Sequence, residues 1–351
     1  MKRIKVLIVD DSSLVRSILS SELKKDPEIE VIGTAMDPFQ ARDMIIINKP
    51  DVMTLDVEMP KMDGIEFLKR VMTNFPIPTI IISSLTLKGG ELAMKAYENG
   101  AIDVVLKPSK NLANDLSTMI HDLTDKIKIA SKINIQAKRL HNEVSIGHDY
   151  KEKAILSNST DKVIAIGAST GGTEALSYLL KNLKVDLPGI VVVQHMPPFF
   201  TENFAKRLNN ESKLHVKEAA TDDIVTNGNV YIAPGGKQMR VYRSGGRYKI
   251  KCTVEAKVHN LAPSVSILFQ SIAEFVGNNA IGIMLTGMGK DGAEEMALMR
   301  RNGAYNIGQD EQSCVVYGMP KAAKECGAID KEVSLAQISH ELYKRLETMG
   351  K

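Results

Sequence analysis

The sequence lacks several features that mark common classes of protein. Its three cysteines have neither the spacing of metal ligands nor the even number of a disulfide framework, which favours a reducing compartment. No apolar run is long enough to span a bilayer, and the apolar stretch near the N-terminus is too short for a signal peptide. We therefore expect a cytoplasmic protein without membrane insertion.

Signals for nucleic-acid and nucleotide binding are also scarce. The net charge is only +3, and the basic residues between 126 and 139 have no aromatic residues among them. The glycine-rich stretch 167–172 lacks both the lysine of a P-loop and the G-x-G-x-x-G spacing of a dinucleotide site. We therefore expect no nucleic-acid partner.

A length of 351 residues predicts two domains, and both halves alternate apolar strands with helices. The apolar runs that predict strands of a parallel sheet in the first half lie at 5–9, 30–35, 51–55, 79–82 and 103–106. Polar and basic residues predominate from 130 to 160, which indicates a linker. We therefore expect one domain at 1–129 and a second at 161–351.

Five polar residues follow these predicted strands: Asp10, Asp11, Asp56, Ser83 and Lys107. Because the carboxyl ends of parallel strands meet at one edge of a sheet, we expect these side chains to lie close together. Clustered carboxylates attract a hard divalent cation, Mg²⁺, with Asp11 and Asp56 as its ligands. Asp56 is then the natural phosphoryl acceptor, with Ser83 and Lys107 near the phosphoryl oxygens. Helix capping alone would explain one of these aspartates but not the whole set.

In the second half, a predicted buried strand at 163–166 runs into a glycine turn whose tip is Ser169. The turn fits G-x-S-x-G, in which a sharp strand–turn–helix connection exposes a nucleophilic hydroxyl. Backbone N–H groups would then face an oxyanion, and we expect Thr170 and Met288 to supply them. Taken alone, the stretch could also be a turn that only joins strand to helix, or a phosphate-binding loop.

Two further strand ends supply partners for this serine. His195 follows an apolar strand at 189–194, and Asp291 comes after one at 281–286. If these strands are parallel neighbours, Ser169, His195 and Asp291 meet as nucleophile, base and orienting acid. Taken singly, His195 could be a structural hydrogen bonder and Asp291 the cap of its own helix. The chain order Ser, His, Asp is not that of α/β-hydrolases, which indicates a different fold.

Motifs at 55–64, 167–172, 194–197, 233–236, 286–293 and 310–320 resemble those of the chemotaxis protein-glutamate methylesterase family, called CheB. The likeness covers nearly the whole chain. It implies an N-terminal flavodoxin-like receiver with a five-stranded parallel sheet, followed by a doubly wound, Rossmann-like α/β sheet with an added β-hairpin. The triad candidates fall on the family's catalytic motifs, and Asp56 falls on its phosphorylated aspartate.

The resemblance implies a phosphorylation-regulated hydrolase of chemotaxis adaptation. Members of the family demethylate γ-glutamyl methyl esters of chemoreceptors, deamidate some receptor glutamines, and are phosphorylated by a chemotaxis histidine kinase. No cofactor is implied for ester hydrolysis itself. The sequence departs from the family pattern at Gln238, Ser266 and Glu295, where the family usually has His, Asp and Gly. The alternative from another class is a non-enzymatic response regulator whose second domain binds a nucleotide or a partner protein.

Overall fold

The structure is a computed structural model that describes residues 2–59, 64–107, 112–133 and 161–349. The chain separates into two compact units, and each is described on its own. Most of the expected linker at 130–160 lies outside the described residues. Within the described residues, none of the helices is long and apolar enough to cross a membrane.

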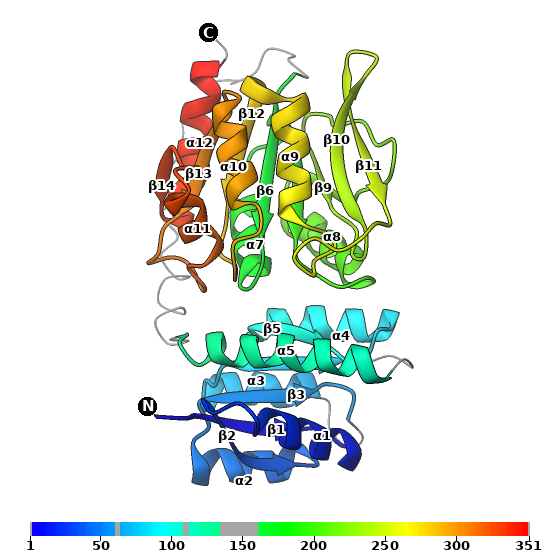
Figure 1. Cartoon of the computed structure of the whole chain (residues 1–351), viewed down its shortest axis with the longest axis vertical. Helices are drawn as coiled ribbons and strands as arrows, with labels where there is room; N and C mark the ends of the chain where they lie inside the picture. The colour runs from blue at the N-terminus through cyan, green and yellow to red at the C-terminus, as the bar shows by residue number, and fades with distance from the viewer. Residues whose placement is uncertain (1, 60–63, 108–111, 134–160, 350–351) are drawn as a thin grey trace. The chain divides into compact units, whose positions relative to one another are not determined.

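The N-terminal unit is a parallel α/β sheet (Figure 1). Its elements are β1 (Ile4–Val9), α1 (Ser13–Leu23), β2 (Ile29–Ala35), α2 (Pro38–Asn48), β3 (Val52–Asp56), α3 (Gly64–Asn74), β4 (Thr79–Ser83), α4 (Leu87–Glu98), β5 (Asp103–Leu106) and α5 (Leu112–Ala130). The five strands lie in the order β2-β1-β3-β4-β5, which confirms the expected receiver sheet. Ser12 caps α1 and Asp37 caps α2 ahead of Pro38, so both helices begin where the local sequence favours a start.

The sheet forms the centre of this unit, and its inner strands are buried on both faces. Strand β3 is buried along its whole length, as is β4. Such continuous apolar strands are typical of parallel sheets covered by helices. Helices α1 and α5 contact each other on one face, and α3 lies between α2 and α4 on the other. Polar residues lie at the carboxyl edge of the sheet. Asp56 is the last residue of β3, and Asp10 and Lys107 directly follow β1 and β5.

The C-terminal unit is a larger α/β sheet with a separate hairpin. Its elements are β6 (Val163–Ala168), α7 (Gly172–Lys181), β7 (Gly189–Gln194), α8 (Phe200–Glu211), β8 (His215–Glu218), β9 (Asn229–Ile232), β10 (Gln238–Ser244), β11 (Arg247–Thr253), α9 (Val265–Phe275), β12 (Ala280–Met284), α10 (Ala293–Arg301), β13 (Tyr305–Gln309), α11 (Met319–Glu325), β14 (Lys331–Val333) and α12 (Leu335–Met349). Seven parallel strands lie in the order β14-β13-β12-β6-β7-β9-β8.

Strand β6 lies in the middle of this sheet, between β12 and β7, and pairs with both in parallel. The chain first extends the sheet on the β7 side and then crosses back to β12 to extend the other side. The winding direction therefore changes between β6 and β12. Ligand sites of doubly wound sheets form at such a point, at the carboxyl ends of the strands. The expectation that the strands before Ser169, His195 and Asp291 are parallel neighbours is confirmed.

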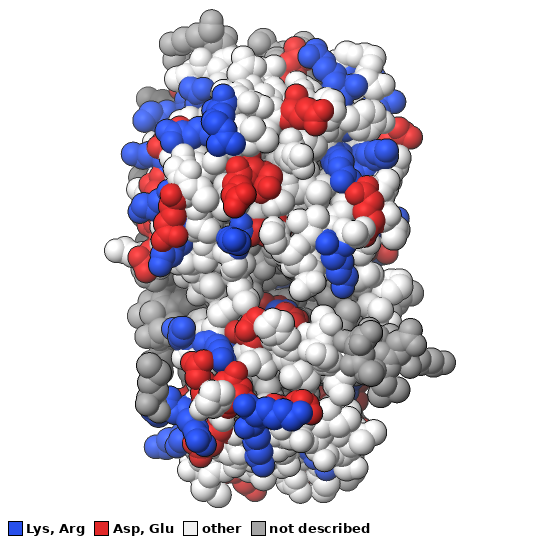
Figure 2. Space-filling model, in the orientation of Figure 1, with Lys and Arg blue, Asp and Glu red and all other residues white. Residues whose placement is uncertain are grey.

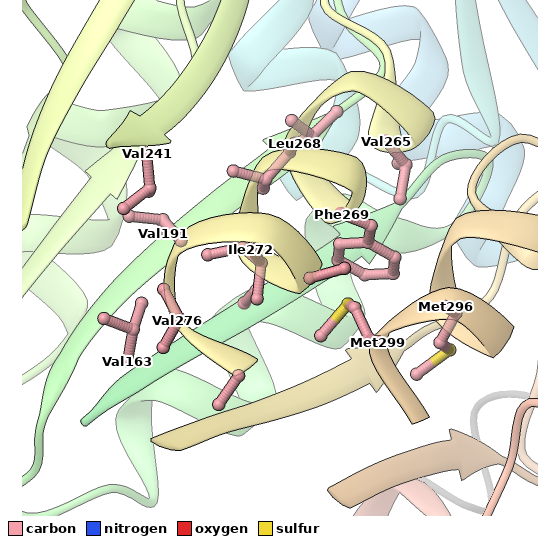
Figure 3. Close-up of a cluster of buried hydrophobic side chains, with 14 of the residues drawn as sticks. Val163, Val191, Val241, Val265, Leu268, Phe269, Ile272, Val276, Met296 and Met299 are labelled. Atoms are coloured by element: carbon pink, nitrogen blue, oxygen red, sulfur yellow. The ribbon is translucent and has the colours of Figure 1, made fainter. Parts of the chain in front are cut away.

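Helix α9 packs over the sheet beside α10 through an apolar cluster (Figure 3). The completely buried members of this cluster include Val163, Val265, Leu268, Phe269, Ile272, Met296 and Met299. They come from β6, α9 and α10, so the cluster fixes α9 against the strand that carries the candidate nucleophile. The position of the N-terminus of α9 follows from this packing.

The expected hairpin is also present, as β10 paired with β11. Its turn places Gly245 and Gly246 at φ values of 57° and 77°, which two consecutive glycines adopt without strain. The inner side chains Met239, Val241 and Ile250 are buried in the same cluster as α9. The hairpin therefore covers part of the helix layer rather than extending the sheet.

Candidate active site and receiver site

The turn that carries Ser169 is held by short backbone hydrogen bonds. Ser169 N donates to Thr286 O at 3.0 Å, and Gly172 N donates to Ser169 O at 2.7 Å. Gly171 has a φ of 78°, which makes the turn sharp before α7 begins at Gly172. Ser169 is half-buried at the end of β6, so the turn presents its hydroxyl at the carboxyl edge of the sheet.

His195 lies beside this turn because its own backbone is bonded to it. His195 N donates to Ala168 O at 3.1 Å, one residue before the serine. Gln194 Nε2 donates to Ser169 O at 3.0 Å and to His195 O at 3.2 Å. The buried Gln194 amide thus ties the two segments together. Gln194 belongs to the 194–197 motif, but its contacts were not predicted from the sequence, although its position directly before the predicted base was a signal.

Asp291 reaches the same place from the loop after β12. Its Oδ2 lies 2.8 Å from His195 Nε2. Its carboxylate also accepts bonds from Ser264 Oγ at 2.8 Å, from Val265 N at 2.6 Å and from Ser266 N at 3.2 Å. Asp291 therefore caps a helix, as the alternative supposed, but the helix is α9 and not its own α10. Neither serine was predicted from the sequence to contact Asp291.

The charge state of Asp291 determines the tautomer of His195. Burial alone would raise the pKa of Asp291, but hydrogen bonds from His195, Ser266 and Ser264 outweigh it and lower the pKa to about 2. An ionised carboxylate only accepts hydrogen bonds, so His195 Nε2 must carry the proton. The other ring nitrogen, Nδ1, is then the acceptor that remains for a serine proton.

Within the described residues, no hydrogen bond joins Ser169 Oγ to His195. The structure therefore brings all three triad candidates to one edge of the sheet but bonds only His195 to Asp291. Catalytic hydrogen bonds often tighten only when a substrate is bound. The role of Ser169 as a nucleophile stays a prediction.

The loop that carries Met288 contacts the serine turn directly. A Cβ added at Gly287 would lie 2.8 Å from Ser169 Cβ and 3.1 Å from Ser169 N, so a side chain there would displace the serine. Thr286 Oγ1 also donates to Thr170 O at 3.0 Å. The segments carrying Thr170 and Met288 are thus tied together around Ser169. Their part as oxyanion donors stays a prediction.

In the receiver unit, one lysine joins two strand-end aspartates. Lys107 Nζ lies 2.5 Å from Asp56 Oδ2 and 3.2 Å from Asp10 Oδ2. The other oxygen of each carboxylate accepts a local N–H, from Ser12 to Asp10 and from Glu58 to Asp56, both at 2.9 Å. Each aspartate therefore shapes its own turn with one oxygen and faces the shared site with the other.

The electrostatics of this site follow from burial and crowding. Burial raises the pKa of Asp10; the Lys107 charge opposes this and the Asp56 carboxylate adds to it. For Lys107, burial acts to lower the pKa, but the Asp56 and Asp10 carboxylates outweigh it and raise the pKa. Lys107 is therefore a permanent cation beside two buried carboxylates.

Three carboxylates at this edge fit a divalent cation. One oxygen each from Asp10, Asp11 and Asp56 lies within 4.8 Å of the others. Asp10 Oδ2 is buried and has no aligned hydrogen-bond partner among the described residues, although the Lys107 ammonium is close enough for an ion pair. Carboxylate oxygens are the ligands that Mg²⁺ prefers. The residues present fit the expected cation, with Asp10 beside the two predicted ligands.

Ser83 lies at the expected edge, at the end of β4, but its hydroxyl donates to Gly89 O at 3.3 Å. In the described part of the chain, no hydrogen bond joins this hydroxyl to Asp56 or Lys107, although the backbone N–H of Lys107 donates to Ser83 O at 2.8 Å. The next residue, Ser84, donates to Glu58 Oε2 at 2.5 Å. Ser84 and Glu58 were not predicted as site residues, although they lie one position after Ser83 and two positions after Asp56.

Surface charge gives no support for a nucleic-acid partner on the visible face. In Figure 2, Lys and Arg side chains alternate with Asp and Glu, and neither sign forms a continuous field over the described residues shown. A nucleic-acid backbone requires a clustered basic surface.

Comparison with known proteins agrees with the geometry. The CheB methylesterase family model matches residues 164–342, and the response regulator receiver domain model matches residues 6–121. A Syntrophotalea carbinolica protein named protein-glutamate methylesterase/protein-glutamine glutaminase is 51% identical over 96% of this chain and 96% of its own length. A Syntrophus aciditrophicus relative, number 2 of that name, is 49% identical over 97% of this chain and 99% of its own. The solved CheB methylesterase catalytic domain of Thermotoga maritima has 37% identity and a TM-score of 0.52, covering 54% of this chain and 100% of that one.

The fold and these likenesses define a response regulator whose second domain is an enzyme. The chain belongs to the CheB family of protein-glutamate methylesterase/protein-glutamine glutaminases. The family resemblance and the enzyme class expected from the sequence are confirmed. The non-enzymatic alternative is not supported.

Proposed function

We propose that the chain hydrolyses γ-glutamyl methyl esters of methyl-accepting chemotaxis receptors, and deamidates receptor glutamines to glutamate, with Ser169 as nucleophile. The observation that carries this proposal is the 2.8 Å hydrogen bond between His195 Nε2 and Asp291 Oδ2, beside the strand end that carries Ser169. The names of the relatives, which include both reactions, support the substrate class.

The proposed reaction uses the chain's own groups. His195 Nδ1 accepts the proton as Ser169 Oγ attacks the ester carbonyl, and Asp291 stabilises the imidazolium that forms. The backbone N–H groups of Thr170 and Met288 hold the oxyanion. The imidazolium then protonates the leaving methoxide, and methanol departs. Water activated by His195 hydrolyses the acyl-enzyme to glutamate, and a glutamine amide releases ammonia by the same route.

In the receiver, we propose that Asp56 accepts a phosphoryl group from a chemotaxis histidine kinase. Mg²⁺ held by Asp10, Asp11 and Asp56 would neutralise charge on the phosphoryl oxygens. Phosphorylation converts the Asp56 carboxylate, now paired with Lys107, into a bulkier dianionic group, so Lys107 and Ser83 must adjust their contacts. We propose that this change relieves inhibition of the catalytic domain.

The proposed arrangement is a receiver at 1–129, a linker at 130–160 and a catalytic domain at 161–351. Alternating strands and helices in each half and the two compact units support this division. We place the protein in the cytoplasm, because the proposed kinase and the receptor segments that carry the methyl esters are there.

The test of the nucleophile is methanol release from methylated receptor by the Ser169→Ala variant. We expect a loss of about a thousandfold or more in rate, since the variant has no group to form the acyl-enzyme. Ser244→Ala, at the exposed hairpin tip, is the matched control and should keep full activity. A serine-directed fluorophosphonate should label the wild type and not Ser169→Ala. Full methanol release by Ser169→Ala would refute the assignment.

A further inference from the structure

Ser266 and Glu295, from two different helices, contact each other beside Asp291. Ser266, in the first turn of α9, donates its hydroxyl proton to Glu295 Oε2 of α10 at 2.7 Å. The same hydroxyl oxygen accepts Gly292 N at 2.9 Å. Ser266 N donates in turn to Asp291 Oδ1 at 3.2 Å. The two positions are distant in the sequence, so only the tertiary structure identifies them as a pair.

The chemistry of a hydroxyl explains why the pair belongs together. A serine hydroxyl has one proton and two acceptor sites. Because the Ser266 hydroxyl donates its hydrogen bond to the Glu295 carboxylate, a lone pair of Ser266 Oγ is left to accept the Gly292 N–H. Without the carboxylate, the hydroxyl proton could rotate toward the Gly292 N–H, and two donors would face each other. Glu295 therefore keeps Ser266 an acceptor for the peptide that directly follows Asp291.

The backbone at this point has little freedom to adjust. Gly292 has a φ of 86°, and a Cβ added there would lie 2.4 Å from Val265 Cγ1. Asp291 is thus held at both ends, since its carboxylate is bonded to the start of α9 and the following peptide is bonded to Ser266. A change at Ser266 therefore alters where the carboxylate meets His195 Nε2.

We propose that Ser266 and Glu295 form one positioning unit for Asp291, in which the Glu295 carboxylate orients the Ser266 hydroxyl. The proposal rests on the proposed role of Asp291 in orienting His195. An aspartate at 266 could accept the Gly292 N–H directly, and a glycine at 295 would leave room for it. With Glu295 present, an aspartate at 266 would face a second carboxylate at close range, and like charges repel.

The test is a double-mutant cycle on the full-length chain, with methanol release from methylated receptor as the assay. We expect Ser266→Asp and Glu295→Gly each to lower kcat about tenfold while KM changes less than about twofold, because the defect lies in orienting His195 and not in binding. The double variant Ser266→Asp/Glu295→Gly should recover kcat to within about threefold of the wild type. Glu295→Gln should also stay within about threefold, since its amide oxygen still accepts the hydroxyl proton.

Glu294→Gly is the matched control, because Glu294 is an exposed neighbour in the same turn of α10. It should leave kcat unchanged, and melting temperatures of all variants separate unfolding from mispositioning. The unit is refuted if the double variant is no more active than Ser266→Asp alone, or if Glu295→Gln is as impaired as Glu295→Gly. Full activity of Ser169→Ala, assayed in parallel, would overturn the proposed function instead, so the two failures are distinguishable.

Discussion

Asp291 combines two tasks in one carboxylate. It accepts a bond from His195, and it accepts three more from the start of α9, where the helix has unpaired N–H groups and the positive end of its dipole. The result is a carboxylate that stays ionised while buried. This arrangement links the charge state of a candidate catalytic residue to the stability of the domain.

The first prediction concerns the pH dependence of that stability. The pKa of Asp291 is lowered from 3.8 to about 2 in the folded chain, so its contribution is complete above pH 3.8 and is lost as the pH falls through 2. We expect Asp291→Asn to lower the free energy of unfolding of the catalytic domain at pH 7 by about 2 kcal/mol. Between pH 4 and pH 2 the difference between the two proteins should shrink.

The measurement is urea unfolding of the wild type and Asp291→Asn at pH 7, 4 and 2.5, followed on the transition of the catalytic domain. Asp186→Asn is a suitable control, because Asp186 lies in the same domain and is exposed at the surface. A stability difference that stayed constant down to pH 2.5 would contradict the assigned charge state.

At the scale of elements, α9 acts as the support of the candidate site. Its inner face is buried against β6 and α10 (Figure 3). Its first residues bind Asp291. Its N-terminal Ser264 makes no side-chain cap for its own helix and donates its hydroxyl to Asp291 instead. We therefore expect the packing of α9 against the sheet to determine where its N-terminal residues hold Asp291.

The second prediction belongs to this scale. Phe269→Ala should destabilise the catalytic domain by about 4 kcal/mol, because it leaves a cavity in place of a fully buried ring. Methanol release by the fraction that remains folded should also fall, because the start of α9 loses its support. Phe275→Ala, whose ring on the same helix is 39% exposed, should cost less than about 1 kcal/mol. Thermal unfolding and activity of both variants test this. Equal effects of the two substitutions would contradict it.

At this scale, helix starts and turns can be predicted from the sequence, because they depend on residues that are neighbours in the chain. Ser12 and Pro38 mark helix starts, and two consecutive glycines mark the turn from Ser244 to Arg247 that joins β10 to β11. The partner of Ser266 could not be predicted, because no periodicity relates α9 to α10. The contacts of Gln194 were missed for the same reason, since they depend on how β7 pairs with β6.

At the scale of the whole molecule, two α/β units share one design principle. Each places its polar groups at the carboxyl edge of a parallel sheet, and each uses a buried carboxylate as the central group, Asp56 in one and Asp291 in the other. The proposed regulation requires that chemistry at the first edge alters turnover at the second.

The prediction at this scale is that a small phosphodonor with Mg²⁺ raises methanol release by the wild type, while Asp56→Asn does not respond. The reason is that an amide cannot accept the phosphoryl group and cannot replace a carboxylate ligand. Basal release by Asp56→Asn should stay near that of the unphosphorylated wild type. Chelation of Mg²⁺ should abolish the response of the wild type without lowering its basal rate.

The matched control for this experiment is Asp43→Asn. Asp43 is an exposed aspartate of the same domain that forms an ion pair with its neighbour Arg42 at the surface. It should respond to the phosphodonor as the wild type does. A normal response by Asp56→Asn would show that another residue receives the phosphoryl group.

The strands that lead to the two candidate sites, the residues at their ends and the turn around Ser169 could be predicted from the sequence alone, because burial and turn formation depend on nearby residues. The sequence thereby predicted that Ser169, His195 and Asp291 follow strands. The tertiary structure was needed to show that those strands are neighbours, that Asp291 caps α9, and that Ser266 contacts Glu295. These facts depend on strand order and helix packing, which are set by the whole core and not by any local stretch.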